Sequence, residues 1–121
     1  MAPQIPQNLK FWGILFNGMK SSCYILYSNQ LDKFYVGYTT IGADDRLEKH
    51  LSDHYGLTRF THKAKDWILF LEIKCINAEQ ARKIEKHIKS MKSKTFIYNL
   101  KKYPEMIDRV LKKFSPDNSQ N

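Results

Sequence analysis

Two apolar runs separated by a polar break predict a β-hairpin in the first third of the chain. The runs cover about residues 23–28 and 34–38, and the break between them reads Asn-Gln-Leu-Asp-Lys, a composition typical of turns. Antiparallel pairing places Tyr24 and Tyr35 on one face, with Tyr24 opposite Gly37, if the loop holds an even number of residues. An odd loop without a bulge separates the two rings, so the pattern leaves both arrangements open.

A helix, a loop and a third strand follow the hairpin. Asp44 and Asp45 offer an N-cap for a helix over about residues 45–55. The polar stretch 56–66 predicts an exposed loop. The run 67–75 is rich in Trp, Ile, Leu and Phe, which predicts a third strand, and its continuous apolar character favours a central position buried on both faces.

A second amphipathic helix begins after the third strand. Asn77 predicts its N-cap, with Gln80 three residues later in capping-box spacing. The helical period places Glu85 at the edge of the apolar stripe and turns Lys83 and Lys86 outward. The stripe consists of Ala81, Ile84, Ile88 and Met91.

The length of 121 residues indicates one domain with flanking segments. We expect residues 1–20 to form an extension outside the domain, and residues 95–100 to form a short extended or helical segment. Pro104 can open a last helix, so residues 101–114 are expected to pack on the domain as a C-terminal helix. Residues 115–121 are expected to form a flexible tail.

The net charge of +8 is concentrated in one segment. Residues 82–102 hold eight Lys and Arg against a single acid, Glu85, so this segment alone carries +7. Such a concentration favours a polyanionic partner, with nucleic acid ahead of a membrane surface or an acidic protein. A solvated lysine-rich face that keeps the protein soluble is the alternative.

The two cysteines, Cys23 and Cys75, lie in predicted strands and form no Cys-x-x-Cys pair. A cysteine zinc site is therefore excluded, and nothing indicates a disulfide framework. This cysteine usage fits a reducing, cytoplasmic setting.

Three polar residues on the predicted helices are candidates for chemistry. Glu85 can bind a divalent ion, because Mg²⁺ needs only one or two protein carboxylates; its alternative is a salt bridge to Lys89 or Arg82. Arg46 can bind phosphate oxygens through its forked donors, or it is a surface arginine at a helix start. His50 can orient or deprotonate a water molecule, or it is structural.

Taken in order, these residues resemble the GIY-YIG nuclease domain over about residues 21–100. The matching positions are Ser22-Cys23-Tyr24, Tyr35-Val36-Gly37, Arg46, Glu85 and Asn99. Residues 60–67 and 88–92 are similar to the small, single-domain bacterial members. Ser22-Cys23 replaces the family's glycine and isoleucine, which is expected to change backbone packing more than chemistry.

The resemblance implies an α+β (mixed α/β) fold, a small three-stranded antiparallel sheet flanked by helices. It also implies a metal-dependent DNA endonuclease using one Mg²⁺ (or Mn²⁺), with a role in repair or recombination. Tyr35 would act on the attacking water with help from His50, while Tyr24 and Arg46 would hold the phosphate. Glu85 would carry the metal, and Asn99 and Gly37 would support the site.

The resemblance further implies DNA as the partner. We expect lysines of the exposed loop and of the basic segment to contact it. These lysines are Lys63, Lys65, Lys89, Lys92 and Lys94. A protein partner or a second copy of the chain could supply targeting, and no membrane is expected. The alternative is a binding module of the same fold that cuts slowly or not at all.

Overall fold

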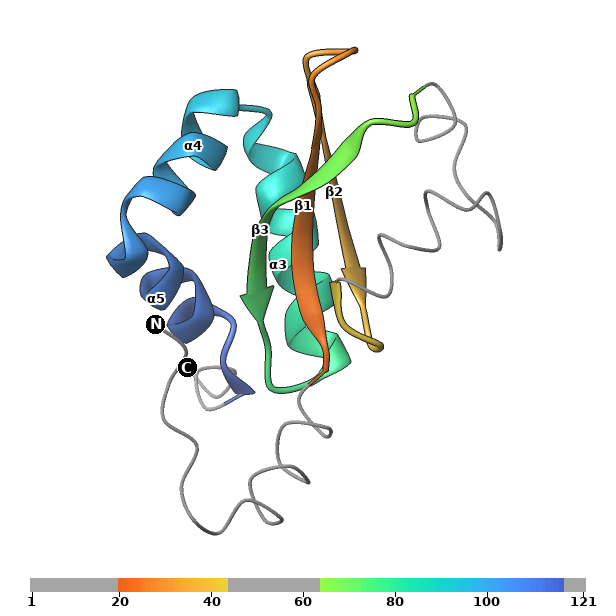
Figure 1. Cartoon of the computed structure of the whole chain (residues 1–121). Coiled ribbons are helices and arrows are strands. Elements are labelled where there is room, and N and C mark those ends of the chain that lie inside the picture. Colours follow the sequence, from red (N-terminus) through yellow and green to blue (C-terminus); the bar gives the residue numbers. More distant parts are fainter. Residues whose placement is uncertain (1–19, 44–63, 117–121) are drawn as a thin grey trace, which may run out of the picture.

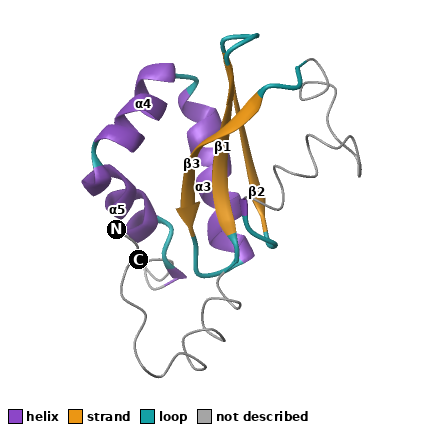
Figure 2. Cartoon of the chain, in the orientation of Figure 1, coloured by secondary structure: helices purple, strands orange, loops and turns teal. Residues whose placement is uncertain are grey.

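The computed structural model describes residues 20–43 and 64–116. Three strands and three helices follow one another along this part of the chain (Figures 1 and 2). They are β1 (Ser22–Ser28), β2 (Lys33–Thr39), β3 (Trp67–Lys74), α3 (Ala78–Met91), α4 (Lys94–Lys102) and α5 (Pro104–Lys113). The strands form one antiparallel sheet, so the expected α+β architecture is confirmed.

The register of the hairpin decides between the two arrangements left open by the sequence. Ser28 pairs with Lys33, so the loop between β1 and β2 holds the four residues 29–32. Tyr24 is therefore opposite Gly37, and Tyr35 is opposite Leu26. Because side chains alternate between faces along a strand, both tyrosines lie on the same face of the sheet.

The strand order is β2-β1-β3, so the expectation that the third strand is central was wrong. The first strand is central, and β3 is an edge strand. A register shift between Ile25 and Leu26 leaves Phe70 as an extra residue in β3. This bulge lets Phe70 and its neighbour Leu71 pack against the same core, which explains why an edge strand has a continuous apolar run.

The two faces of the sheet have different coverings. We call the face that packs against α3 the helix face; its buried strand residues are Cys23, Ile25, Val36 and Ile73. We call the opposite face the tyrosine face; its side chains include Tyr24, Leu26, Tyr35, Trp67 and Leu69. Figure 1 shows α3 behind the sheet, with α4 and α5 beside it.

Helix α3 begins as its sequence predicts. The Asn77 side chain accepts a hydrogen bond from the backbone N–H of Gln80 at 2.8 Å, and the Gln80 side chain accepts one from the backbone N–H of Ile76 at 2.9 Å. These contacts satisfy donors at the start of the helix. The apolar stripe is buried at Ala81, Ile84 and Ile88.

Met91 does not belong to the buried part of that stripe, because 43% of it is exposed. It is the last residue of α3, directly before Lys92, whose φ of 47° turns the chain toward α4. The stripe therefore ends one turn before the helix does.

The segment expected to be extended or helical is helical. Ser93 caps α4 by accepting a hydrogen bond from the backbone N–H of Phe96 at 3.0 Å, and Pro104 opens α5 as expected. The Gln80 side chain donates to the backbone carbonyl of Leu111 at 3.1 Å, which joins the start of α3 to α5. The expected helix over 45–55 and nearly all of the expected extension, 1–20, lie outside the described residues.

Candidate active site

Tyr24 lies in the central strand and crosses β2 at Gly37. Only 1% of Tyr24 is exposed. A Cβ atom at position 37 would stand 2.6 Å from the Tyr24 hydroxyl oxygen and 2.7 Å from the ring carbon that carries it. Position 37 therefore requires glycine, because the Tyr24 ring comes so close to it. Of the two arrangements that the sequence left open, the structure has the one with Tyr24 opposite Gly37.

Tyr35 stands beside Tyr24 on the tyrosine face. The two ring centroids are 6.4 Å apart with an angle of 36° between the planes. On its other side, Tyr35 meets Trp67 edge to face, at 6.4 Å and 64°. Tyr35 is half-buried, so β2 and β3 hold its ring in place while part of it stays accessible.

The entry to β3 is fixed to the hairpin by Asp66. Its carboxylate accepts hydrogen bonds from the Ser28 hydroxyl at 2.6 Å and from the backbone N–H of Gln30 at 2.7 Å. The hydrogen bond from Ser28 is the main reason why the pKa of Asp66 is lowered. This tie fixes the chain directly before Trp67, and so supports the ring that packs on Tyr35.

Glu72 is a polar residue of the tyrosine face that the sequence reasoning missed. It pairs with Tyr24 across β1 and β3, and its carboxylate accepts a hydrogen bond from the backbone N–H of Ala43 at 3.1 Å. A carboxylate within the run Leu-Phe-Leu-Glu-Ile was the available signal, because a charged residue in an apolar strand needs a partner. The partner comes from the chain that follows β2.

Glu85 is on α3, the helix that covers the opposite face of the sheet. Its side chain is 18% exposed and accepts from the Lys89 ammonium at 3.1 Å, so the salt bridge considered from the sequence is present. The buried Cys23 thiol has a raised pKa, caused first by burial, then by Cys75 and then by Glu85. The structure thus brings Tyr24 and Tyr35 together and places Glu85 on a different layer.

The surroundings of Glu85 fit a divalent ion held by a single carboxylate. Within residues 20–43 and 64–116, no group of three or more His, Cys, Asp or Glu side chains could enclose an ion. Mg²⁺ does not need such a cage, since it keeps several waters and takes other oxygens from phosphate. A partly exposed carboxylate whose partner among the described residues is a lysine can provide that one ligand.

Asn99 and the predicted DNA-contacting lysines are spread over the molecule. Asn99 is half-buried on α4, a helix that packs on the helix-face core. Lys65 is exposed directly before β3, and Lys92 is exposed at the end of α3. Lys94 is paired with Asp32 of the hairpin loop, at 2.9 Å to its carbonyl and 3.6 Å to its carboxylate.

Three of the predicted site residues cannot be placed. Arg46, His50 and Lys63 lie outside the described residues. Their roles stay predictions from the sequence.

The comparison with protein families matches the part of the chain that contains the sheet. The family model of the GIY-YIG catalytic domain matches residues 20–103, which includes all three described strands, α3 and α4. The chain belongs to the GIY-YIG family, and its fold is of nuclease type. Neither the curated proteins nor the solved structures gave a match.

In the part of the chain that the structure describes, the helices are all too short or too polar to cross a membrane.

Proposed function

We propose that the protein is a DNA endonuclease that hydrolyses phosphodiester bonds with one divalent metal ion, in repair or recombination. The observation that carries the proposal is the packing of Tyr24 and Tyr35 side by side, with Gly37 leaving room for the Tyr24 ring. Membership of a family with a nuclease-type fold supports nucleic acid as the substrate. Bound Mg²⁺ or Mn²⁺ would stabilise negative charge on the phosphate and the leaving oxygen.

The two tyrosines take different roles in this proposal. Tyr35, which is half-buried, orients the attacking water through its hydroxyl and exchanges a proton with it, with the help of His50. The buried Tyr24 hydroxyl donates a hydrogen bond to a phosphate oxygen, and Arg46 stabilises the charge that develops on the same group. Asn99 supports the site from α4.

Glu85 is the residue that would hold the ion. In the described structure its partner is Lys89, at 3.1 Å. An ion pair between exposed i and i+4 side chains of a helix contributes only about 0.3–0.5 kcal/mol. Exchanging Lys89 for a metal ion would therefore cost little, and the released lysine would be available for a DNA phosphate.

The alternative function is a nucleic-acid-binding module of the same fold that cuts slowly or not at all. One observation favours it: Glu85 is on the helix that covers the face opposite the tyrosines, and it is already ion-paired. Such a module would still use the lysines of the basic segment. A partner protein or a second copy of the chain would supply targeting in either case.

Glu85→Gln tests the proposal against this alternative. Labelled duplex, nicked, flap, branched and single-stranded DNA are incubated with Mg²⁺ or Mn²⁺, with and without EDTA. We expect cleavage by the wild type, its loss in EDTA, and a rate lower by about 10²–10³ in Glu85→Gln, the size typical of removing one charge-stabilising group.

Glu79→Gln is the matched control. Glu79 is on the same helix and forms the same kind of i to i+4 ion pair, with Lys83 at 3.2 Å, so its loss reports general effects of removing an acid from α3. Equal cleavage by the two variants would reject Glu85 as the metal ligand. Binding of DNA without metal-supported cleavage by the wild type would replace the nuclease with the binding module.

A further inference from the structure

A pocket lies between α3 and the end of α5, apart from the residues proposed to act in cleavage. It has a volume of about 280 Å³ and is lined by Lys83, Lys86, His87, Ser90 and Phe114; we call it the α3–α5 pocket. The four lining residues of α3 are spaced i, i+3, i+4 and i+7, so they share one side of the helix. That side is turned away from the buried stripe that packs on the sheet.

The floor of the α3–α5 pocket is aromatic. The His87 ring centroid is 5.3 Å from that of Phe114 and 5.9 Å from that of Phe96. Burial, followed by the nearby Lys113, lowers the pKa of His87, which favours the neutral imidazole. The pocket thus offers flat, uncharged ring surface, which can stack on another flat ring.

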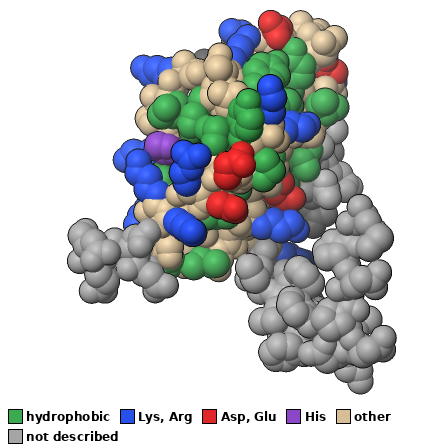
Figure 3. Space-filling view, turned by 90° about the vertical axis from the view of Figure 1, so that its left-hand side faces the viewer, with side chains coloured by type: hydrophobic (Ala, Val, Ile, Leu, Met, Phe, Trp, Pro, Cys, Tyr) green, Lys and Arg blue, Asp and Glu red, His purple; other side chains and the backbone are tan. Residues whose placement is uncertain are grey.

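The rim of the pocket is cationic. Lys83 and Lys86 line it, and the Lys113 ammonium is 5.6 Å from the centroid of the Phe114 ring. Lys86 is exposed, and no ion pair joins it to an acid within the described parts of the chain. Figure 3 shows lysine and arginine side chains gathered beside a histidine on this side of the molecule, and His87 is the only histidine among the described residues.

We propose that the α3–α5 pocket binds a single-stranded segment of nucleic acid, with one base against His87 and Phe114 and the adjoining phosphates on Lys83 and Lys86. Aromatic platforms beside cationic side chains are the arrangement by which proteins hold single strands without reading their sequence. An apolar ligand would gain nothing from the lysine rim, and an acidic peptide would leave the ring surface unused. The inference rests on the proposed nucleic-acid substrate.

The position of the pocket makes it a second contact, separate from the tyrosine face. Its α3 residues lie on the helix that covers the opposite side of the sheet. Phe114 and Lys113 come from the end of α5, which begins at residue 104, directly after the residues matched by the family model. The pocket is therefore formed partly by sequence outside the matched domain, and a strand bound there would leave the tyrosine face open to another part of the substrate.

Binding of a fluorescently labelled oligothymidine, followed by anisotropy over a range of salt concentrations, tests the inference. The double variant Lys83→Gln/Lys86→Gln is compared with Lys101→Gln/Lys102→Gln, which removes the same charge from α4. Each phosphate contact on a single strand contributes about 0.7 to the magnitude of the negative slope of log K against log salt. We therefore expect the slope of the pocket variant to be smaller in magnitude by about 1.4. The α4 variant removes two charges from the same basic segment, so it reports the general effect of lost charge, and its slope should change less than that of the pocket variant.

Phe114→Leu tests the aromatic floor while keeping an apolar side chain in the core. We expect affinity to fall about tenfold, the lower part of the range for losing one stacked base, with an unchanged salt slope. Photo-crosslinking to an oligonucleotide that contains 5-iodouracil should join the base to the peptide that carries His87 or Phe114.

The outcomes separate this inference from the proposed function. Equal affinities and slopes for the two double-lysine variants, or crosslinks confined to other peptides, would reject the pocket, while Glu85-dependent cleavage would still support the nuclease. A wild-type protein that binds neither single strands nor duplexes would reject both. Both proposals would be supported by three results together. The pocket variant would have a smaller salt slope, the crosslinks would map to the peptide that carries His87 or Phe114, and cleavage would still depend on Glu85.

Discussion

The helix face and the tyrosine face are built from alternate residues of the same three strands, yet they differ in polarity and in what covers them. In β1, Cys23 and Ile25 point to the helix face, while Tyr24 and Leu26 point to the other. The helix face is closed by aliphatic side chains of α3. The tyrosine face has rings with hydroxyl groups, the Glu72 carboxylate and a glycine that gives one ring its space.

The difference shows how a small domain can separate stability from chemistry. Side chains alternate with a period of two along a strand, so a change at one position affects one face only. The larger of the two buried clusters lies on the helix face, so we expect apolar burial there to contribute the larger share of the stabilisation. The tyrosine face can then keep polar groups that would be costly in a core.

The largest expected effect is on cleavage, from Tyr35→Phe. Loss of the hydroxyl should slow cleavage about 10²–10⁴-fold, the usual contribution of a group that transfers a proton, and should change the free energy of unfolding by only about 1 kcal/mol. Tyr38→Phe is the control, since Tyr38 lies on the same strand, is 39% exposed and pairs with Cys23 of the helix face. Similar rates for the two variants would remove Tyr35 from the mechanism.

Ile84→Ala should affect stability much more than cleavage. Ile84 is fully buried on α3, so its truncation should lower the free energy of unfolding by about 2–5 kcal/mol, measured by urea denaturation. The folded fraction should cut DNA at a rate much closer to the wild-type rate than Tyr35→Phe does, because Ile84 belongs to the helix-face core and the tyrosines to the opposite cluster. If Ile84→Ala instead slowed cleavage and left the free energy of unfolding unchanged, the two faces would not be independent.

Gly37→Ala should lower the free energy of unfolding by a smaller amount, through a clash on the tyrosine face. The added methyl group would meet the Tyr24 hydroxyl and ring, and we expect a loss of about 1–3 kcal/mol from overpacking. In a Tyr24→Leu background the same substitution should cost less, and the coupling between the two changes is read from a double-mutant cycle in thermal unfolding. An equal cost in both backgrounds would mean that the ring does not occupy that space.

Local signals predicted much of this fold. Asn77 and Gln80 fixed the start of α3 because capping depends on residues three apart. The pairing of Tyr24 with Gly37 was among the expected alternatives, because glycine in a strand indicates a close approach. The position of β3 could not be read in the same way, since its apolar run fits a central strand as well as a bulged edge strand, and only the strand order separates the two.

The sequence predicted which residues belong to the candidate site, but not how they are placed relative to one another. The tyrosines could be assigned to neighbouring strands, but whether they share a face depends on the loop length, which the structure decides. Glu72 was missed, because its hydrogen bond to Ala43 joins segments 29 residues apart, and no local pattern encodes that contact. Glu85 was placed correctly at the edge of the apolar stripe, but helical periodicity cannot say which face of the sheet the helix will cover.

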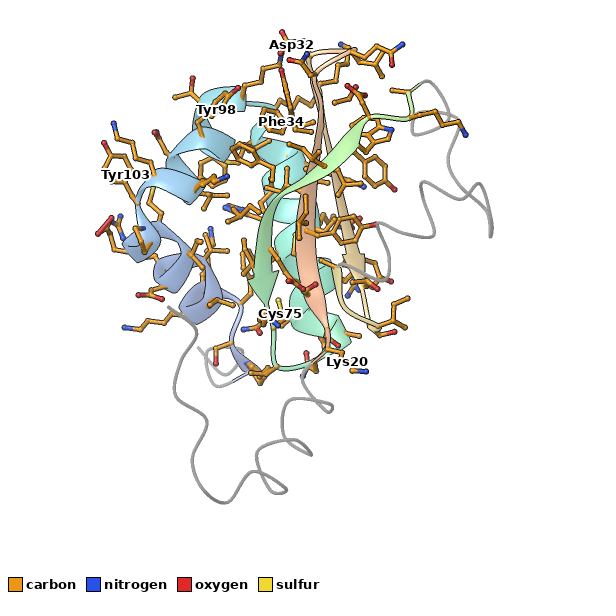
Figure 4. The ribbon with its side chains drawn as sticks, in the orientation of Figure 1. Lys20, Asp32, Phe34, Cys75, Tyr98 and Tyr103 are labelled. Carbon is orange, nitrogen blue, oxygen red and sulfur yellow. The ribbon has the colours of Figure 1, made fainter. Side chains whose placement is uncertain are left out.

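Gln80 joins the segment matched by the family model to α5, which begins directly after that segment. Its buried side chain accepts from the start of α3 and donates to Leu111 of α5, and Val110 is part of the same core. Figure 4 shows some of the α5 side chains between this helix and the sheet and others on its outer side. A fragment that stops at Tyr103 would leave the Gln80 amide without this acceptor and would expose part of that core, so we expect the smallest fragment that folds on its own to extend through α5.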